Sequence, residues 1–418
     1  MKETRFRFSI LFVLALLWLT TGCTVKWQFP ADSPIVSTPA LASDGTIYFN
    51  SMKFLYALSP KGKLRWRYSP GDAEFKSSPV VGPDGSIYVA DTSCVLHAVN
   101  PDGSRRWLAD LSRRDSPQPS GTICGNPPTP TLIPAGILVV DKIVGFASVV
   151  DPATGTMTAR FTGWGTSINS SASPEVASDT LVMGSGSLQS IDSFGNILWT
   201  VNLSDGRHFV PFRTPPAITD SGVIAIAGWD DKLHVYKSDG SLAWEVPGEW
   251  WANPVIASDG TIYVGGMGNT GLVALRSDGT KLWEAQIIGP GDPAIAADGT
   301  LYVPGRYANE SRPPSLWPSW LPWFFAALRD PWKYALYTVT ADGTVKSHVD
   351  VRGPISSGPA IGPDGTIYFG TSSNGAMGPK GDSGILYAVR GSSPLMAGGW
   401  PKSCGSPTND GHAPANRR

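Results

Sequence analysis

The chain has 418 residues, a formal net charge of −1 and only 16% charged residues. That low charged fraction, together with 47 Gly and 37 Pro, favours short strands joined by tight turns and argues against long surface helices. Because the sequence contains no basic run, nucleic-acid binding has little electrostatic support, and we expect no nucleic-acid partner.

The N-terminus predicts an export signal over residues 1–22. Lys2, Arg5 and Arg7 form a basic start, and the apolar stretch at 8–19 is too short to span a bilayer comfortably. A signal of this kind directs the chain out of the cytoplasm and is removed from the mature protein.

The export signal ends in Leu19-Thr20-Thr21-Gly22-Cys23, which resembles the lipobox of bacterial lipoproteins. The resemblance implies that Cys23 is lipidated, and more than one acyl chain there would anchor the protein stably. Thr24 in place of Asp implies, by the same resemblance, an outer-membrane location facing the periplasm. The alternative is a plain secretory signal with a chance cysteine.

After the signal, one pattern recurs with a period of roughly 40 residues, which is typical of a repeat architecture. Each copy opens with a proline, a residue tolerated at the start of a strand but not in its middle. This proline occurs eight times, at Pro39, Pro79, Pro130, Pro174, Pro216, Pro254, Pro293 and Pro359.

Each copy reads as four short strands. The second strand alternates β-branched and aromatic residues, as in TIYV at 261–264. The third strand resembles LYAL at 55–58, and the fourth strand carries a Trp. Four antiparallel strands repeated at this period are typical of a propeller blade. We therefore expect an all-β fold, an eight-bladed β-propeller of four-stranded blades at 23–400, followed by a C-terminal tail at 401–418.

Asp-Gly or a variant separates strands one and two, and again strands three and four, as at Asp44-Gly45 and Asp239-Gly240. The pair is a strong hairpin signal, because Gly accepts a positive φ and Asp tolerates it. Turn geometry accounts for these aspartates, and calcium binding is the alternative. The fourth-strand tryptophans form one column that can fill the space between blades: Trp66, Trp107, Trp199, Trp244 and Trp283.

Closure of the ring needs one more strand, because the copy that starts at Pro359 has only three, ending at 386–389. The segment 25–29 reads as an orphan fourth strand, so we expect this N-terminal strand to complete blade eight and close the ring. Trp400 offers a rival fourth strand.

The segment 359–370, PAIGPDGTIYFG, followed by LYAV at 386–389, resembles the pyrroloquinoline-quinone (PQQ)-type propeller repeat. The resemblance covers residues 25–400 and implies an eight-bladed ring. This family includes quinoprotein dehydrogenases and the BamB-type lipoproteins of the outer-membrane β-barrel assembly machinery, which bind partners without catalysis. Size, repeat number and lipid signal make the chain most similar to the BamB type.

No catalytic site stands out. A resemblance to quinoprotein dehydrogenases would imply an adjacent Cys-Cys pair, a catalytic Asp and calcium ligands, but no two cysteines are adjacent. His97 and His234 replace a Tyr of the third strand, which favours structural, hydrogen-bonded histidines. The sequence leaves enzyme activity undecided and favours its absence, with no cofactor or metal; PQQ and calcium belong to the alternative.

Strand counting places the 1–2 and 3–4 turns on one face of the ring, the turn face, and the 2–3 and 4–1 loops on the other, the loop face. Long irregular segments gather on the loop face, and function concentrates on such loops. The candidate binding residues there are Trp164, Arg207, His208, Phe212, Arg213, Trp250 and Trp251. The alternative is that these rings pack beneath their own loops.

Three cysteines follow the signal. Cys94 lies in the 2–3 loop of blade two and Cys124 in the 4–1 loop that leaves this blade, so both are expected on the loop face. We predict a disulfide between them, worth about 3 kcal/mol in the loop-entropy model, with Cys404 free or an alternative partner.

Blade seven carries an insertion at 304–334 between its second and third strands, too short and too interrupted by proline to span a membrane. Its aromatic residues include Trp317, Trp320, Trp323 and Phe324. One interpretation is a lid over the channel that buries its own rings. The other is an aromatic patch that docks on a partner or in the lipid headgroup layer near Cys23.

These observations favour a monomeric, non-catalytic scaffold of the cell envelope that binds a protein or an envelope polymer, with outer-membrane protein assembly as one such role. One alternative is a PQQ-dependent oxidoreductase of the quinoprotein dehydrogenase type. Another is a glycan-binding propeller with Trp stacking platforms.

Overall fold

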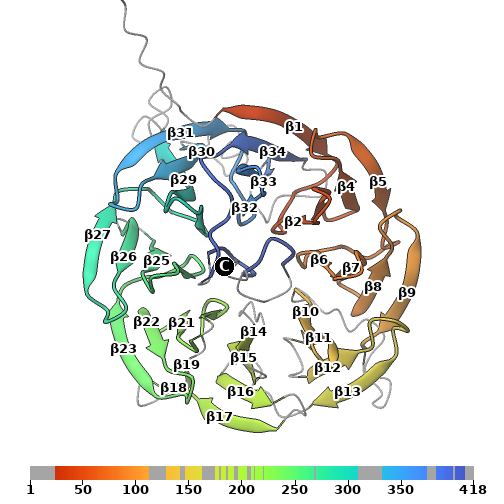
Figure 1. Ribbon diagram of the computed structural model, residues 1–418, viewed down its shortest axis with the longest axis horizontal. Coiled ribbons are helices and arrows are strands. Elements are labelled where there is room, and N and C mark those ends of the chain that lie inside the picture. Colours follow the sequence, from red (N-terminus) through yellow and green to blue (C-terminus); the bar gives the residue numbers. More distant parts are fainter. Residues whose placement is uncertain are drawn as a thin grey trace, which may run out of the picture.

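The computed structural model describes residues 24–112, 129–141, 146–161, 175–177, 180–184, 187–192, 196–204, 209–210, 212–219, 221–267, 270–308, 332–373, 383–398 and 401–409. These segments form strands and turns arranged as a ring of blades (Figure 1). Within them, no helix is long and apolar enough to cross a membrane.

Eight four-stranded antiparallel sheets make up the ring, which confirms the predicted fold class. In blades one to seven the strands follow one another in sequence from the channel to the rim (Figure 1). Blades one to four contain β2 (Ala40–Leu41), β3 (Ile47–Asn50), β4 (Leu55–Leu58), β5 (Leu64–Tyr68); β6 (Val80–Val81), β7 (Ile87–Ala90), β8 (Val95–Val99), β9 (Arg105–Asp110); β10 (Thr131–Ile133), β11 (Gly136–Asp141), β12 (Phe146–Val150), β13 (Met157–Phe161); and β14 (Glu175–Ala177), β15 (Thr180–Gly184), β16 (Leu188–Asp192), β17 (Ile197–Val201).

The remaining blades follow a two-stranded hairpin, β18 (Leu203–Ser204) and β19 (Phe209–Val210). Blades five to eight contain β20 (Ala217–Ile218), β21 (Ile224–Ala227), β22 (Lys232–Tyr236), β23 (Leu242–Pro247); β24 (Val255–Ile256), β25 (Ile262–Gly265), β26 (Leu272–Leu275), β27 (Lys281–Ala285); β28 (Ala294–Ile295), β29 (Leu301–Ala308), β30 (Trp332–Val339), β31 (Val345–Val351); and β32 (Ala360–Ile361), β33 (Thr366–Ser372), β34 (Gly384–Arg390), β1 (Val25–Ala31).

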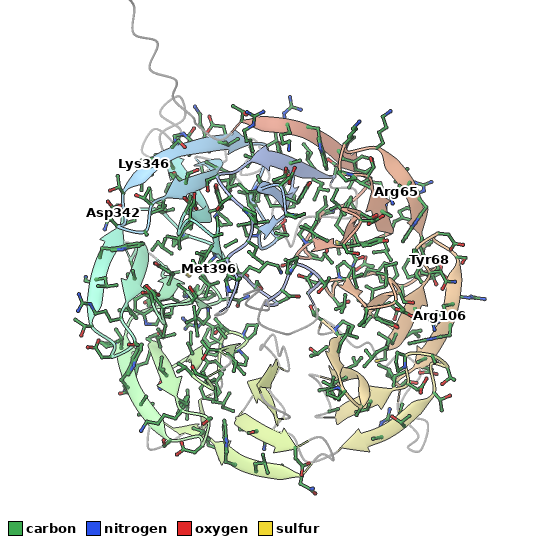
Figure 2. The ribbon with its side chains drawn as sticks, in the orientation of Figure 1. Arg65, Tyr68, Arg106, Asp342, Lys346 and Met396 are labelled. Carbon is green, nitrogen blue, oxygen red and sulfur yellow. The ribbon has the colours of Figure 1, made fainter. Side chains whose placement is uncertain are left out.

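Burial decreases from the channel towards the rim of each blade. Every residue of β3 and β4 is buried, because neighbouring blades cover both faces of these strands. The outermost strand β5 alternates exposed and partly buried residues. Figure 2 shows Arg65 and Arg106 on such rim strands, and each guanidinium binds the aspartate of its own 1–2 turn, with Arg65 Nη1 2.9 Å from Asp44 Oδ2.

The aspartates of the Asp-Gly turns act as turn caps. Asp44 Oδ1 accepts a hydrogen bond of 2.9 Å from the Thr46 N–H, and Asp342 Oδ1 accepts one of 3.0 Å from the Thr344 N–H. Hydrogen bonds, first that of the Thr340 hydroxyl, lower the pKa of Asp342 to about 2. The turn interpretation of the repeated Asp-Gly pair therefore has a direct structural basis.

Neighbouring blades are joined by a repeated contact between an indole and a glycine. Trp66, in the rim strand of blade one, donates from Nε1 to the Pro101 carbonyl in the 3–4 turn of blade two, at 2.8 Å. Its ring lies against Gly103 of that turn, where a Cβ would come within 2.7 Å of the indole. The equivalent pairs are Trp27 with Pro60, Trp107 with Pro152, Trp199 with Ser238, Trp244 with Ser277 and Trp283 with Ala341.

The N-terminal strand closes the ring, as predicted. β1 pairs antiparallel with β34, and Trp27 repeats the blade-to-blade contact by donating to the Pro60 carbonyl of blade one at 3.0 Å. Lys26 takes the place of the rim arginines, because its Nζ lies 3.1 Å from Asp364 in the 1–2 turn of blade eight. The segment around Trp27 thus fills the fourth-strand position for which Trp400 was the rival.

Blade seven differs from its siblings in the length of its central hairpin. β29 runs to Ala308 and β30 begins at Trp332, so both ends of the predicted insertion at 304–334 continue the sheet. The aromatic residues Trp317, Trp320, Trp323 and Phe324 lie outside the described residues, as does Trp400.

A matched pair of glycine substitutions tests the blade-to-blade contact. Gly71 and Gly103 both have φ +88°, but a Cβ on Gly71 meets nothing within 4 Å, whereas a Cβ on Gly103 would strike the Trp66 ring. We expect Gly71→Ala to lower the free energy of unfolding by about 1–2 kcal/mol through backbone strain alone. Gly103→Ala should cost about 1–3 kcal/mol more because of overpacking. Equal losses of unfolding free energy for the two variants, measured by denaturant-induced unfolding, would show that the Trp66 indole moves aside without an energetic penalty.

Candidate binding site on the loop face

The loop face carries an exposed aromatic pair, Trp229 and Trp251. Trp229 follows β21 in the 2–3 loop of blade five, and Trp251 lies in the 4–1 loop that leads to blade six. Their ring centroids are 5.5 Å apart with an angle of 73° between the planes, and the residues are 38% and 45% exposed. An exposed pair of indoles is rare without a purpose, because it leaves apolar surface in water.

A buried arginine holds the two rings in place. The Arg213 side chain is 7% exposed, and its guanidinium carbon lies 4.3 Å from the centroid of the Trp229 ring and 4.5 Å from that of Trp251. Arg213 also donates to the Trp250 carbonyl and to Asp231 Oδ1, both at 3.1 Å. Cation–π stacking and these hydrogen bonds fix the geometry of the pair before any partner arrives.

Local backbone pairing decides which tryptophan of the 4–1 loop faces outwards. Trp250 forms an isolated β-bridge with Gly266, and the Trp251 N–H donates to the Gly265 carbonyl at 3.0 Å. Successive side chains on a paired segment point to opposite sides. Trp250 is therefore buried, with 3% exposure, and Trp251 faces solvent.

Met267 extends the apolar surface towards blade six. It is 42% exposed, and its N–H donates to the Glu249 carbonyl at 2.8 Å, two residues before Trp251. Trp229, Trp251 and Met267 are called the loop-face patch below. A methionine suits such a place because its flexible thioether adapts to different partner surfaces.

Two predicted binding residues are corrected. Phe212 is fully buried and Trp250 is nearly so, and each forms the β-bridge by which a 4–1 loop meets the second strand of the next blade. Phe75 and Ile355 form the equivalent bridges in blades two and eight. At Phe212 and Trp250 the bridge buries the ring in the core beneath the loop, so the interpretation that such rings pack under their own loops holds for these two.

Of the other predicted binding residues, Arg213 and Trp251 belong to the patch, whereas Trp164, Arg207 and His208 lie outside the described residues. Trp229 and Met267 are not among the binding residues predicted from the sequence. Alignment of the repeats offers a signal for both, because each is the second residue of the turn after a second strand, at Gly228-Trp229 and Gly266-Met267.

The cysteine predictions are only partly covered by the described residues. Cys94 is disulfide-bonded and Cys404 is free. Cys124, the partner that we predict for Cys94, lies outside the described residues, as does Cys23.

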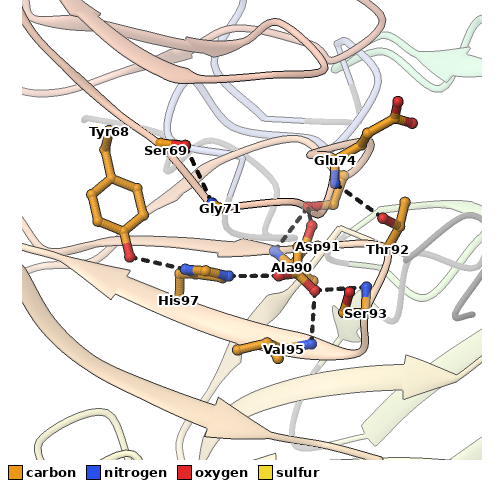
Figure 3. A network of polar contacts seen from close by, with 11 residues as sticks. Tyr68, Ser69, Gly71, Glu74, Ala90, Asp91, Thr92, Ser93, Val95 and His97 are labelled. Carbon is orange, nitrogen blue, oxygen red and sulfur yellow. Dashed lines mark hydrogen bonds and ion pairs between the residues drawn. The ribbon is translucent and has the colours of Figure 1, made fainter. Parts of the chain in front are cut away.

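The histidines of the third strands are structural. His97 is buried, with Nε2 2.9 Å from Asp91 Oδ2 and Nδ1 3.0 Å from the Tyr68 hydroxyl (Figure 3). Asp91 also accepts hydrogen bonds from the Ser93 and Val95 N–H groups and so is held by its own turn. Both ring nitrogens are engaged, one with Asp91 of blade two and one with Tyr68 of blade one, which agrees with the structural interpretation.

The end of the described chain, predicted only as a C-terminal tail, lies at the centre of the ring (Figure 1). Residues 401–409 are largely buried there, and Met396, on the path that leads to them, lies inside the ring (Figure 2). Ser403 of this segment and Asn253 both hydrogen-bond Asp292. Burial of the carboxyl group raises the pKa of Asp292 to about 6, although the residue as a whole is only partly buried.

No group of three or more His, Cys, Asp or Glu side chains that could hold a metal ion is present within the described ranges. The arrangement on the loop face offers recognition through apolar and aromatic contacts.

Replacement of His97 tests the buried network. We expect His97→Leu to lower the free energy of unfolding by about 2–4 kcal/mol, because Asp91 and the Tyr68 hydroxyl lose a buried partner. The control is His348→Leu, since the His348 side chain is 42% exposed, and it should cost at most about 1 kcal/mol. Similar losses for the two variants in urea unfolding would argue against a structural role for His97.

Asp292 gives the folded chain a pH dependence of known sign. Its pKa is raised from 3.8 to about 6, so between these values the folded chain keeps a proton that the unfolded chain has released. Stability from this group is therefore present at low pH and is lost as the pH rises through about 6. We expect the melting temperature of the wild type, relative to that of Asp292→Asn, to fall between about pH 4 and pH 6. A difference in melting temperature between the two proteins that stays constant over this range would contradict the raised pKa of Asp292.

Comparisons with known proteins agree with this architecture. Residues 184–308 match the family described as "Outer membrane protein assembly factor BamB". No curated protein matches the sequence significantly.

Solved structures share the fold at low sequence identity. BamB from Moraxella catarrhalis has a TM-score of 0.62 and 14% identity, covering 87% of this chain and 99% of that one. A europium-containing methanol dehydrogenase has a TM-score of 0.61 and 12% identity, covering 88% and 93%. The C-terminal WD40 domain of Sif2 has a TM-score of 0.60 and 11% identity, covering 87% and 98%. The chain therefore carries the PQQ-like repeat and folds as a BamB-like, eight-bladed propeller.

Proposed function

We propose that the chain is a non-catalytic binding scaffold of the cell envelope that recognises a protein partner with its loop-face patch. The observation that carries the proposal is the exposed Trp229–Trp251 pair, fixed from beneath by Arg213. Rigid, exposed indoles dominate the energy of many protein interfaces, because they bury large areas at a small cost in conformational entropy. The match of the repeat to an outer-membrane assembly factor supports a role in that process.

The path of β1 indicates how a lipid anchor would orient the ring. Val25 pairs with Val389 at the turn-face end of β34, and the Thr24 carbonyl accepts from the Arg390 N–H. Lipidation of Cys23 would therefore attach the acyl chains at the turn face of blade eight, because only Thr24 separates this cysteine from the strand. The loop-face patch would then point away from the membrane and towards partners in the periplasm.

The same geometry bears on the insertion of blade seven. Ala308 and Trp332 form the open end of the β29–β30 hairpin, which points to the loop face. Val25 lies at the opposite face, and a seven-residue strand such as β1 spans about 23 Å. An anchor at Cys23 thus favours docking of the insertion on a partner over insertion into the headgroup layer beside that anchor.

The glycan alternative receives less support from the site. Sugar rings stack on open, flat aromatic faces, but the Trp229 and Trp251 planes are inclined at 73°, and Arg213 lies against both rings. The inclined apolar pair suits an apolar or aromatic side chain of a protein better.

The oxidoreductase alternative needs room for a PQQ-sized cofactor. On the ring axis that room is filled by the chain's own residues 401–409, and the carboxylate beside them, Asp292, is already bonded to Asn253 and Ser403. The residues present at the axis therefore do not fit PQQ while this segment is in place. We assign no catalytic step to the cofactor.

Photo-crosslinking in cells tests the proposal. A photoreactive residue at position 251 should give a crosslink to a defined protein, identified by mass spectrometry, whereas the same residue at position 64 on the rim should not. Trp229→Ala combined with Trp251→Ala should reduce binding of that protein at least about 10-fold, because two interface anchors are lost. The melting temperature should change little, since both side chains are exposed.

The matched control is Leu64→Ala with Leu242→Ala, two rim residues that are 49% and 50% exposed. This pair removes as many exposed apolar side chains without touching the loop face, so binding should persist. Unchanged binding in the tryptophan variant, or crosslinks only to glycan, would refute the protein-docking proposal.

A further inference from the structure

The axial channel of the ring is filled by residues 401–409, called the axial segment below. Lys402 is fully buried, and Ser403, Ser406 and Asn409 are also buried. Two turns shape the segment, closed by hydrogen bonds from the Gly405 N–H to the Lys402 carbonyl and from the Asn409 N–H to the Ser406 carbonyl. A compact, polar piece of chain therefore occupies a place that a propeller ring leaves open at its centre.

The innermost strands bind this segment through their backbone. The Leu41 N–H of blade one donates to the Pro407 carbonyl at 2.8 Å, and the Val81 N–H of blade two donates to the Thr408 carbonyl at 3.0 Å. On the far side of blade eight, the Ile295 N–H of blade seven donates to the Pro401 carbonyl at 2.8 Å. Three separate blades thus supply donors that would otherwise face an open channel.

Side chains add specificity to these contacts. Asn409 Nδ2 donates to the Thr38 carbonyl at 2.9 Å and to the Pro79 carbonyl at 3.1 Å, which joins blades one and two. Asn409 Oδ1 accepts from Lys402 Nζ at 2.6 Å, so the two ends of the segment brace each other. Asn253 of blade six donates to the Ser403 hydroxyl at 3.0 Å.

We infer that the axial channel is a peptide-binding site and that the axial segment is its ligand, bound in cis. The contacts are those of a recognition site, namely backbone donors from three blades and an asparagine whose amide Nδ2 donates to carbonyls of two blades. The ligand class is a short polar peptide with carbonyls placed as in Pro401 and Pro407 and with the Lys402–Asn409 brace. This site is separate from the loop-face patch, so each can fail without the other.

Cleavage of the folded chain tests whether the segment binds as a ligand. A protease site inserted after Gly398 allows the intact protein to fold first and the segment to be released from its tether afterwards. We expect the cleaved peptide to remain bound through gel filtration and to exchange for added synthetic peptide 401–409. A synthetic peptide with Asn409→Ala should bind at least about 10-fold more weakly, because two hydrogen bonds to blade carbonyls are lost.

Loss of the cleaved peptide together with no detectable binding of synthetic peptide would overturn the inference, since the segment would then be held only by its covalent tether. Equal affinities of the wild-type and Asn409→Ala peptides would also overturn it, because the channel would not be reading the asparagine.

A second test uses the full chain and needs no cleavage. Cys404 is partly buried, and this burial raises the pKa of its thiol, so the docked segment should react slowly with thiol reagents. In Asn409→Ala we expect labelling of Cys404, followed by mass spectrometry of its peptide, to be at least about 10-fold faster. Asn100→Ala is the matched control, because Asn100 lies in a 3–4 turn and its side-chain amide donates to the Ser104 hydroxyl of the same turn. Equal labelling rates in the wild type and Asn409→Ala would contradict specific docking.

Discussion

An indole seated on a glycine holds one blade to the next, and the ring depends on this contact. The donor is a rim-strand tryptophan, and the acceptor is a carbonyl of the adjacent 3–4 turn, as between Trp66 and Pro101 at 2.8 Å. The glycine of that turn has a positive φ, which only glycine adopts without strain, and it has no Cβ to strike the ring. One residue type thus meets two requirements at once. The turn-face sequence of each blade is constrained both by its own hairpin and by its neighbour.

Most of this frame could be read from the sequence, because each of its parts has a local signature. The strand-opening prolines and the Asp-Gly turns are fixed by the geometry of a single blade, and the tryptophan column recurs at one position of the fourth strand. The orphan strand around Trp27 was predictable for the same reason, since it carries the Lys-Trp pair that corresponds to Arg65-Trp66. The direction of side chains in the 4–1 loops was not predictable in this way. Trp250 and Trp251 are chemically identical neighbours, and only a long-range bridge to Gly266 buries the first and exposes the second.

The position of the axial segment was equally hidden in the sequence. Burial of Lys402 and Asn409 runs against the usual preference of such residues for the surface, and the sequence predicted only a C-terminal tail there. What stabilises them is a set of partners that come from distant parts of the chain, including the Thr38 and Pro79 carbonyls. Burial of such polar groups is favourable only when all of their hydrogen-bond partners are in place. No local sequence pattern predicts partners that come from distant parts of the chain.

The polar character of the axial segment follows from the ring itself. Innermost strands present unpaired N–H groups to the axis, so an apolar plug would leave them without acceptors at a cost of about 1–3 kcal/mol each. Pro401 and Pro407 meet this need well, because each offers a carbonyl to a blade and brings no N–H of its own that would require a partner. The two ends of the chain therefore complete the ring in different directions. The N-terminal strand closes its circumference by repeating the blade-to-blade contact, and the C-terminal segment fills its axis with acceptors that the blades lack.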